Sequence, residues 1–227
     1  ARAYQFTREA MDEFAISSLA RARAATESGA FAREIVPVEV VSRKGSETVS
    51  TDEQPLKADP AKIPTLKPAF GKDGAITAAN ASSISDGAAA LVMTRASVAE
   101  KLGLKVVAKV VSHAAHAHEP GLFTTAPVPA MQKALKKAGW SVGDVDLFEV
   151  NEAFAVVAMI AERELGIDRA KLNVNGGACA LGHPIGASGA RILATLIAAL
   201  EARGGKRGVA SLCIGGGEAT AMAVELV

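Results

Sequence analysis

The sequence predicts an α/β protein on three observations. From residue 85 onward, short apolar segments that suit strands alternate with longer segments that suit helices, which is typical of helices packed on a mostly parallel sheet. Glycine directly follows several predicted helices, where helices commonly end. The composition, with 49% hydrophobic and 22% charged residues, is that of a folded globular chain.

Composition and charge exclude several kinds of partner. The 227 residues carry 25 Lys and Arg against 24 Asp and Glu, a formal net charge of +1, whereas nucleic-acid binding needs a dense basic face. The longest uncharged apolar run, residues 153 to 161, is too short to cross a bilayer. Two cysteines cannot form a disulfide framework. We therefore expect no nucleic-acid or membrane partner, two free thiols and a cytoplasmic protein.

The first 84 residues predict a loop-rich region. Residues 7 to 28 predict a helix, because a threonine can cap its start, a glycine follows its end and apolar residues recur at three- and four-residue steps. Residues 34 to 42 predict an edge strand, since a central proline removes a hydrogen-bond donor. Residues 43 to 74 contain four prolines alternating with lysines, which predicts an irregular excursion over the surface.

The remaining elements follow from apolar periodicity and from glycine stops. Residues 85 to 93 are small and apolar, which predicts either a buried strand or a buried helix. The predicted helices are residues 96 to 102, 127 to 138, 151 to 165 and 187 to 203, and the predicted strands are residues 105 to 112, 146 to 150, 173 to 175, 208 to 214 and 219 to 227.

Three segments place a chemically useful side chain after a predicted strand, which is where ligands gather in open α/β sheets. The first is Asn151 with Glu152. An asparagine there suits either a plain helix cap, with the acidic residue favoured by the helix dipole, or a group that holds an oxyanion-stabilising water. The residues by themselves favour the cap.

The second segment is a glycine-rich turn that carries His183 between Gly182 and Pro184. Glycine leaves space beside the imidazole and proline stiffens the loop, which suits a general base or a donor to a developing oxyanion. The glycine spacing matches neither common nucleotide-binding loop, so a phosphate cradle is a weak interpretation.

The third segment is Cys213 at the end of an apolar strand, followed by three glycines. A cysteine there can be an inert core residue. Glycines allow close approach of a ligand, and free amide donors stabilise a thiolate over a thiol. The segment therefore predicts a working thiol.

Together these motifs resemble the C-terminal portion of a thiolase. The matching stretches are Asn-Glu-Ala-Phe from Asn151, Asn-Gly-Gly-Ala with Gly-His-Pro-Ile-Gly-Ala-Ser-Gly-Ala-Arg around His183, and Leu-Cys-Ile-Gly-Gly-Gly around Cys213. Asn-Ala-Ser from Asn80 with Asp-Gly-Ala-Ala-Ala from Asp86 is also similar to that family. The resemblance runs in order along the whole chain.

The resemblance implies a thiolase-like fold, with a layered α-β-α core domain, a mixed and mostly parallel sheet, and a loop-rich region that covers coenzyme A. Residues 1 to 84 would be part of the loop domain. Residues 85 to 106 would complete the N-terminal core domain, and residues 107 to 227 would form the C-terminal core domain. Family members are dimers or tetramers, so a homodimer or homotetramer is expected.

The implied function is a CoA-dependent C-acyltransferase. It would catalyse the reversible Claisen condensation of acetyl-CoA to acetoacetyl-CoA and the thiolysis of short 3-ketoacyl-CoA, with CoA and acyl-CoA as substrates and no separate cofactor. In this family the acylated cysteine lies in an N-terminal half that these residues do not include. That half is therefore an expected partner, and this segment alone is expected to be inactive.

The motifs also bear on two other functions. A 3-ketoacyl-ACP synthase is disfavoured, since it lacks the combined motifs around Asn151 and Cys213. A non-catalytic thiolase-like protein that binds acyl-CoA or lipid remains the alternative, although it predicts loss of Asn151, His183 or Cys213, and all three are present.

The motif match implies four catalytic positions. Cys213 would be the acid/base cysteine, and His183 would activate the nucleophile and line an oxyanion hole. Asn151 would position the water that completes that hole. The amide of Gly215 would belong to a second oxyanion hole.

Four further positions would contact the substrate. Ser82 matches the position that touches the pantetheine arm, and Phe154 ends the Asn-Glu-Ala-Phe motif. Phe123 stands where many members have a methionine near the acyl group. Leu56 replaces a common arginine, so Lys57 either supplies a point charge to phosphate or is a solvated loop lysine.

Two other features are expected to be mainly structural. Cys179 stands where the family usually has a small or apolar residue, and is expected to be a packed thiol or else to modulate the redox chemistry of Cys213. A group of four metal-capable residues predicts an ordinary surface cluster rather than a metal site, because alternate strand residues point in opposite directions. These residues are His113, His116, His118 and Glu119.

Overall fold

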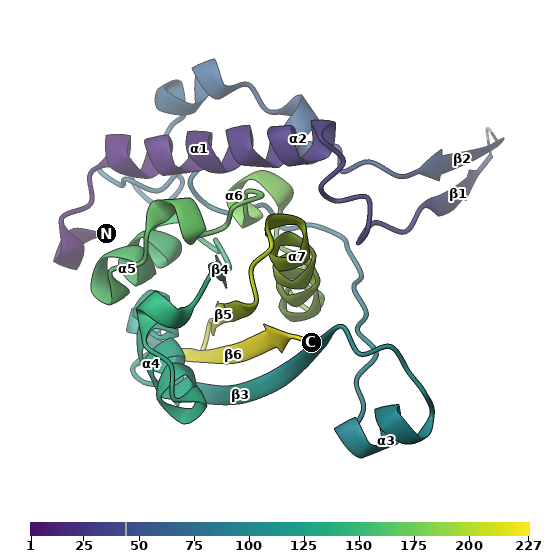
Figure 1. Ribbon diagram of the computed structural model, residues 1–227. Coiled ribbons are helices and arrows are strands. Elements are labelled where there is room, and N and C mark those ends of the chain that lie inside the picture. The colour runs from purple at the N-terminus through teal and green to yellow at the C-terminus, as the bar shows by residue number, and fades with distance from the viewer. Residues whose placement is uncertain (44) are drawn as a thin grey trace.

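A four-stranded mixed sheet lies at the centre of the computed structural model, which describes residues 1–43 and 45–227 (Figure 1). Its order is β3-β6-β5-β4; β3–β6 and β6–β5 are antiparallel, and β5–β4 is parallel. The strands are β3 (Ala108–Ala117), β4 (Leu147–Val150), β5 (Arg207–Ile214) and β6 (Glu218–Leu226).

The mixed character of the sheet is confirmed, but the expectation of mostly parallel pairing is wrong for this sheet. β5 and β6 are joined by the short turn of residues 215 to 217, and a connection that short joins only antiparallel neighbours. The parallel pair β4–β5 is instead connected through the long helix α7 (Ser188–Arg203). That parallel pair matters most for the site, because two strand ends meet at one edge.

Helices cover both faces of the sheet, as the layered prediction requires (Figure 1). On one face, α4 (Pro127–Ala138) and α5 (Ala155–Leu165) bury a core around Phe148. On the other face, α7 buries a second core around Leu196. Each of these helices ends at a glycine in the left-handed conformation, which confirms the glycine stops.

The long helix α1 (Arg8–Glu27) holds the loop-rich region in place. Thr7 caps its start by accepting a hydrogen bond from the amide of Ala10, which confirms the predicted cap. Arg8 donates to the carbonyl of Leu66 at 2.9 Å, and Arg23 donates to that of Pro55 at 2.9 Å. The segment between these carbonyls therefore lies against α1 without needing regular structure.

Apart from α1, the loop-rich region of the first 84 residues contains only short regular elements. Its strand prediction holds from Val38 onward, since the proline at position 37 precedes the strand instead of interrupting it. One residue of the predicted excursion, at position 44, lies outside the described residues. Its short elements are β1 (Val38–Ser42), β2 (Gly45–Val49) and α2 (Gln54–Lys57), with 3₁₀ turns at Arg2–Tyr4 and Pro60–Thr65. Later in the chain, the short elements are α3 (Ala96–Lys101) and α6 (Ala178–Leu181), with 3₁₀ turns at Pro120–Thr125, Val142–Asp144 and Arg169–Lys171.

Two predicted elements are corrected. Residues 85 to 93 form neither a buried strand nor a buried helix: they run as an irregular segment, and Val92 is 99% exposed. Apolar composition predicted burial, but no sheet or helix face of the described residues covers this segment. Residues 173 to 175 form a turn, in which Asn173 has a left-handed φ of 47°.

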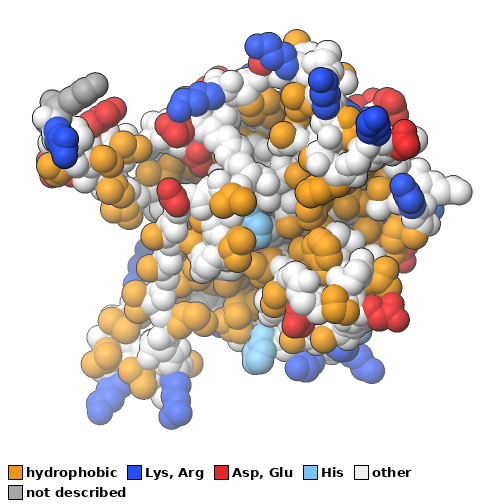
Figure 2. Space-filling view, turned by 180° about the vertical axis from the view of Figure 1, so that it is seen from behind, with side chains coloured by type: hydrophobic (Ala, Val, Ile, Leu, Met, Phe, Trp, Pro, Cys, Tyr) orange, Lys and Arg blue, Asp and Glu red, His pale blue; other side chains and the backbone are white. Residues whose placement is uncertain are grey.

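Apolar side chains of the segment from residue 84 to 106 lie exposed around α3. Figure 2, seen from behind, shows apolar side chains gathered in that part and across the middle of the same face. None of the helices in the described part of the chain is long and apolar enough to span a membrane.

We expect Leu196→Ala to lower the free energy of unfolding by about 2–5 kcal/mol, because Leu196 is fully buried between α7 and the sheet. Urea unfolding would measure the loss. Leu102→Ala is the matched control, since Leu102 is 62% exposed, and should change stability by less than about 0.5 kcal/mol. Equal losses in the two variants would contradict the described core.

Candidate active site

The carboxyl ends of β4 and β5 lie side by side and bring Asn151 and Cys213 to one edge of the sheet. The parallel pairing reaches Val150 opposite Ser211, and the amide of Asn151 continues it by donating to the carbonyl of Ser211 at 2.9 Å. Cys213 follows two positions later on β5. The predicted meeting of these two segments is therefore present.

Asn151 is not a helix cap, contrary to what the residues alone favoured. Helix α5 begins only at Ala155, with Phe154 in the capping position and no side-chain cap. The backbone of residues 151 to 154 is instead held by the segment before residue 85, because the Ala155 amide donates to the Asn80 carbonyl. The buried side-chain amide of Asn151 therefore caps no helix and is directed to the site.

His183 is held between that same segment and the start of α7. Its amide donates to the carbonyl of Ser83 at 3.1 Å, and it forms a parallel bridge with Ile84. Gly182 has a φ of +83°, and a side chain there would clash with Ser85. The glycine before the histidine is therefore required both by backbone conformation and by close approach.

The hydrogen bonds of the imidazole assign its tautomer. Ser188 donates its hydroxyl hydrogen to the carbonyl of Pro184 at 3.0 Å, so its oxygen accepts from His183 Nδ1–H at 2.6 Å. His183 Nε2 then carries a lone pair and no proton, and it accepts from Asn151 Nδ2 at 3.4 Å. The structure therefore joins the two predicted residues through the nitrogen that can act as a base.

The surroundings of His183 favour its neutral form. Burial lowers the pKa of the imidazole below its ordinary value, and the nearby positive charge of Arg191 lowers it further. A neutral imidazole with its lone pair on Nε2 can take a proton at neutral pH. That is the state a general base requires.

Cys213 is buried at the end of β5, and burial raises the pKa of its thiol to about 11. The expectation that neighbouring amide donors favour the thiolate is therefore wrong for the resting state, because desolvation has the largest effect on this pKa. In the described residues no hydrogen bond joins the sulfur to His183. At rest the sulfur therefore carries a proton. It can donate that proton, and it can accept one only after it has lost it.

The glycine turn after Cys213 is anchored at its far end. Gly217 has a φ of +101°, and a side chain there would clash with the carbonyl of His118. Gly215 is exposed, and no backbone hydrogen bond of the described residues uses its amide. Its N–H is therefore available to an anionic oxygen.

Three of the predicted substrate positions converge on the residues after Asn151. Ser82 donates its hydroxyl hydrogen to the carbonyl of Ala153 at 3.1 Å. The rings of Phe123 and Phe154 meet edge to face, with centroids 6.1 Å apart. Both phenylalanines pack against the buried cluster that includes Cys213.

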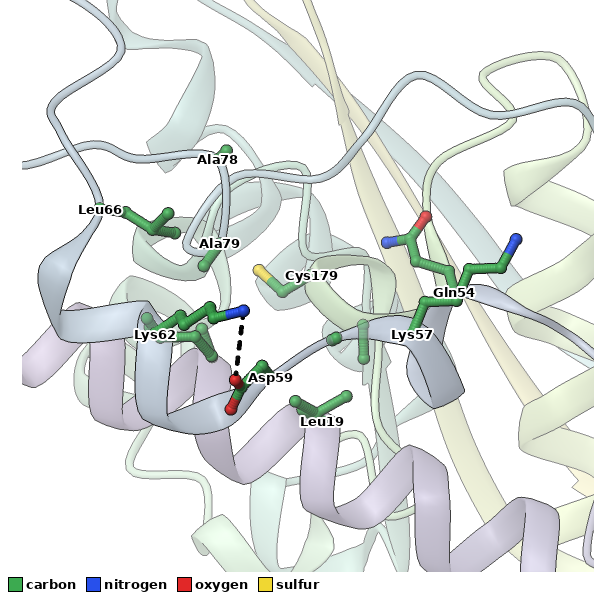
Figure 3. Close-up of a pocket in the computed structure, with 13 residues that line it drawn as sticks. Leu19, Gln54, Lys57, Asp59, Lys62, Leu66, Ala78, Ala79 and Cys179 are labelled. Carbon is green, nitrogen blue, oxygen red and sulfur yellow. Dashed lines mark ion pairs between the residues drawn. The ribbon is translucent and has the colours of Figure 1, made fainter.

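Lys57 lies apart from these residues. It is exposed on α2 and forms an ion pair with Glu53 at 3.0 Å. It stands at a cavity of about 280 Å³ between α1 and the loop-rich region, where Figure 3 shows Lys57 and Lys62 on opposite sides. Neither His183 nor Cys213 lines this cavity.

Cys179 also lines that cavity, with its sulfur directed toward Ala79 (Figure 3). The thiol donates to the carbonyl of Glu152 at 3.8 Å, and burial together with the charge of Glu152 raises its pKa well above the ordinary value. Both cysteines are free. Cys179 is therefore the packed, protonated thiol that the sequence predicts.

The histidine cluster forms ordinary surface contacts. His116 Nε2 lies 3.3 Å from His118 Nδ1, and Lys133 Nζ lies 3.0 Å from His116 Nδ1. A positive ammonium group beside the ring disfavours a cation there. Across residues 1–43 and 45–227, no three metal-capable side chains form a group that could hold an ion.

Two residues hold the site together in roles that were not predicted from the sequence. Ser188 fixes the imidazole, and a serine opening the helix five positions after His183 is the signal that could have found it. Glu152 is 0% exposed and accepts three hydrogen bonds from separate parts of the chain. Its partners are distant in sequence, so no local pattern reveals them.

Comparison with known proteins supplies the family. The family model described as "Thiolase, C-terminal domain" matches residues 104–226, and the one described as "Thiolase, N-terminal domain" matches residues 1–97. The chain belongs to the thiolase family. The division of this thiolase chain at residues 84 and 106 stays a prediction.

Relatives of this thiolase chain include proteins named acetyl-CoA acetyltransferase and thiolase. The acetyl-CoA acetyltransferase of Escherichia coli K12 is 52% identical over 226 residues, which cover 99% of this chain and 57% of that protein. The crystal structure of the Bacillus anthracis acetyl-CoA acetyltransferase is 44% identical with a TM-score of 0.96, covering 100% of this chain and 58% of that one. A thiolase of Ascaris suum, solved in complex with coenzyme A, is 42% identical with a TM-score of 0.90, covering 100% of this chain and 58% of that one.

These comparisons confirm the thiolase-like α/β fold that the motifs implied. This thiolase chain spans a little over half the length of the relatives it matches.

We expect alkylation of Cys213 by iodoacetamide to keep accelerating above pH 9, because only the thiolate reacts and its pKa is about 11. Cys179→Ala leaves Cys213 as the one thiol, and the rate would be measured from pH 7 upward while circular dichroism monitors folding. A cysteine-containing peptide, whose thiol titrates near 8.5, is the control and should level off earlier. A plateau for Cys213 below pH 9 would contradict the burial described.

Proposed function

We propose that this chain carries the acid/base half of an acetyl-CoA C-acetyltransferase site. The reactions are the reversible Claisen condensation of acetyl-CoA to acetoacetyl-CoA and the thiolysis of short 3-ketoacyl-CoA. The observation that carries this proposal is the His183 Nε2 lone pair, 3.4 Å from Asn151 Nδ2, beside the strand end that bears Cys213. Relatives named acetyl-CoA acetyltransferase support it.

His183 has two successive roles in this proposal. Its Nε2 first takes the proton of the nucleophilic cysteine, whose thiolate attacks the acyl carbon and expels the CoA thiolate. The same Nε2–H, together with a water held by Asn151, then donates to the oxygen on which enolate charge develops. One nitrogen serves both steps because Ser188 holds Nδ1–H throughout.

Cys213 moves the proton of the α-carbon. In thiolysis its thiol gives that proton to the departing enolate of acetyl-CoA, which is the step for which a protonated thiol is ready. In condensation the CoA thiolate expelled during acylation first takes the proton of Cys213 and leaves as CoA. The Cys213 thiolate then removes the α-proton, and the carbanion attacks the acyl carbon. The acylated cysteine is released as a thiolate and takes back the proton held by His183. The amide of Gly215 stabilises the oxyanion of the acyl group.

The acylated cysteine lies outside these 227 residues in this proposal. The chain's other cysteine, Cys179, is a protonated thiol bonded to the carbonyl of Glu152, which makes it a poor nucleophile. This segment alone is then inactive, and an N-terminal half is its partner. A homodimer or homotetramer and the cytoplasm, where free thiols persist, stay parts of the proposal.

Substrate binding follows the same edge. Ser82 would touch the pantetheine arm, and Phe123 and Phe154 would border the acyl group, where their rings already meet. Lys57 would bind a phosphate of CoA after giving up its exposed ion pair with Glu53. CoA and acyl-CoA are substrates here, with no separate cofactor.

Thiolysis of acetoacetyl-CoA tests the proposal. The 227-residue chain should show none. A chimera that joins it to the portion of the Escherichia coli relative outside the match should turn over. If the chimera binds acetoacetyl-CoA but never cleaves it, the chain is an acyl-CoA-binding protein and the proposal is wrong.

In the active chimera, we expect Cys213→Ser to keep acylation by acetyl-CoA while losing condensation by about 10²–10⁴-fold, because a serine hydroxyl is a far weaker acid/base for the α-carbon. Acyl-enzyme formation and release of tritium from labelled acetyl-CoA would be measured separately. Cys179→Ser is the matched control and should retain both. Normal tritium release from Cys213→Ser would remove Cys213 from the proposed role.

A further inference from the structure

The carboxylate of Glu152 lies fully buried among three separate segments. Its Oε2 accepts from the hydroxyl of Ser18 on α1 at 2.7 Å and from the amide of Cys179 on α6 at 3.1 Å. Its Oε1 accepts from Asn173 Nδ2 at 2.8 Å. No ion pair of the described residues involves this carboxylate, so neutral donors alone satisfy it.

This carboxylate fixes the start of the loop that leads to His183. Gly177 packs so closely on it that any side chain there would clash with the carboxyl group. The Gly177 amide donates in turn to Ser18 Oγ at 2.9 Å. The four-residue helix α6 and Gly182 then carry the chain from this anchor directly to His183.

The same carboxylate is tied to the strand end that carries Asn151. Asn173 Nδ2 donates to the Val150 carbonyl at 2.8 Å as well as to Glu152, and Asn173 Oδ1 accepts from the Val150 amide at 2.8 Å. Glu152 itself directly follows Asn151. One buried group therefore joins the end of β4 to the entrance of the histidine loop.

We propose that Glu152 is a positioning residue that sets the separation of the Asn151 amide and the His183 imidazole. Its oxygens are engaged by Ser18, Asn173 and Cys179, so it acts through the loop and touches no reactant. The catalytic meaning of this role rests on the proposed function. The positioning itself requires no substrate.

Ser18→Ala is the first test: it removes the shortest of the three hydrogen bonds to Glu152, together with the bond from the Gly177 amide to Ser18, and leaves the other two donors to Glu152 in place. Ser112→Ala is the matched control: it also deletes a buried serine hydroxyl, bonded at 2.6 Å to the Ala134 carbonyl, but on β3 and outside the network. Glu152→Gln is a second variant, in which the new NH2 group would face a donor in either orientation, the Cys179 N–H or Asn173 Nδ2.

The measurement is the titration of the His183 ring by NMR in the full 227-residue chain, with the signal assigned by its loss in His183→Asn. Burial lowers the pKa of this ring below the ordinary 6.5. A loosened loop admits water, so we expect Ser18→Ala to raise the midpoint by about half a unit, and Glu152→Gln by more. Ser112→Ala should titrate like the unaltered chain.

The inference is overturned if Ser18→Ala titrates like the unaltered chain, or if Ser112→Ala shifts the midpoint equally. Both of these outcomes depend on Ser18→Ala and Ser112→Ala alone, so they hold even if Glu152→Gln fails to fold. In an active chimera, Ser18→Ala should lower kcat with KM unchanged, since the substrate contacts stay in place. The NMR result needs no turnover, so an inactive chimera would defeat the proposed function without touching this inference.

Discussion

The contact between Asn151 Nδ2 and His183 Nε2, 3.4 Å long, is the point on which the rest of the site depends. It joins the end of β4 to a loop that returns 32 positions later in the chain. Neither partner could hold this geometry alone: the parallel pairing with β5 places Asn151, and Ser188 with the backbone of Ser83 places the ring. The site is thus a junction between a strand end and a loop, which is where α/β sheets bind ligands.

Burial gives this junction its chemistry by acting on two groups in opposite ways. Removing water disfavours a charged form, so the pKa of His183 falls while that of Cys213 rises to about 11. Both groups are therefore neutral at rest, one able to accept a proton and the other able to donate one. Proton transfer to His183 and from Cys213 therefore requires no pre-formed ion pair, and charge develops only during the reaction.

The sequence alone predicted much of this, for reasons that lie in particular residues. Glycine stops located α4, α5 and α7, since a left-handed residue ends a helix locally. Asn151, His183 and Cys213 were found because each follows a predicted strand, and their roles came from the resemblance of the surrounding motifs to thiolases. The antiparallel β5–β6 pair was missed, although its short turn was legible in the sequence.

Other features could not be read from local patterns. Glu152 is bound by Ser18, 134 positions away, and only the folded chain brings the two together. The segment containing Val92 was predicted as buried from its composition, but burial depends on what covers it. The high pKa of Cys213 likewise comes from packing and not from the glycines that follow it.

The central claim is most directly tested by ¹⁵N NMR of the His183 imidazole, which distinguishes its two neutral tautomers. At a pH well above its pKa, the hydrogen bond to Ser188 predicts a proton on Nδ1 and a lone pair on Nε2. A proton found on Nε2 instead would leave the ring without a base facing Asn151, and would contradict the account.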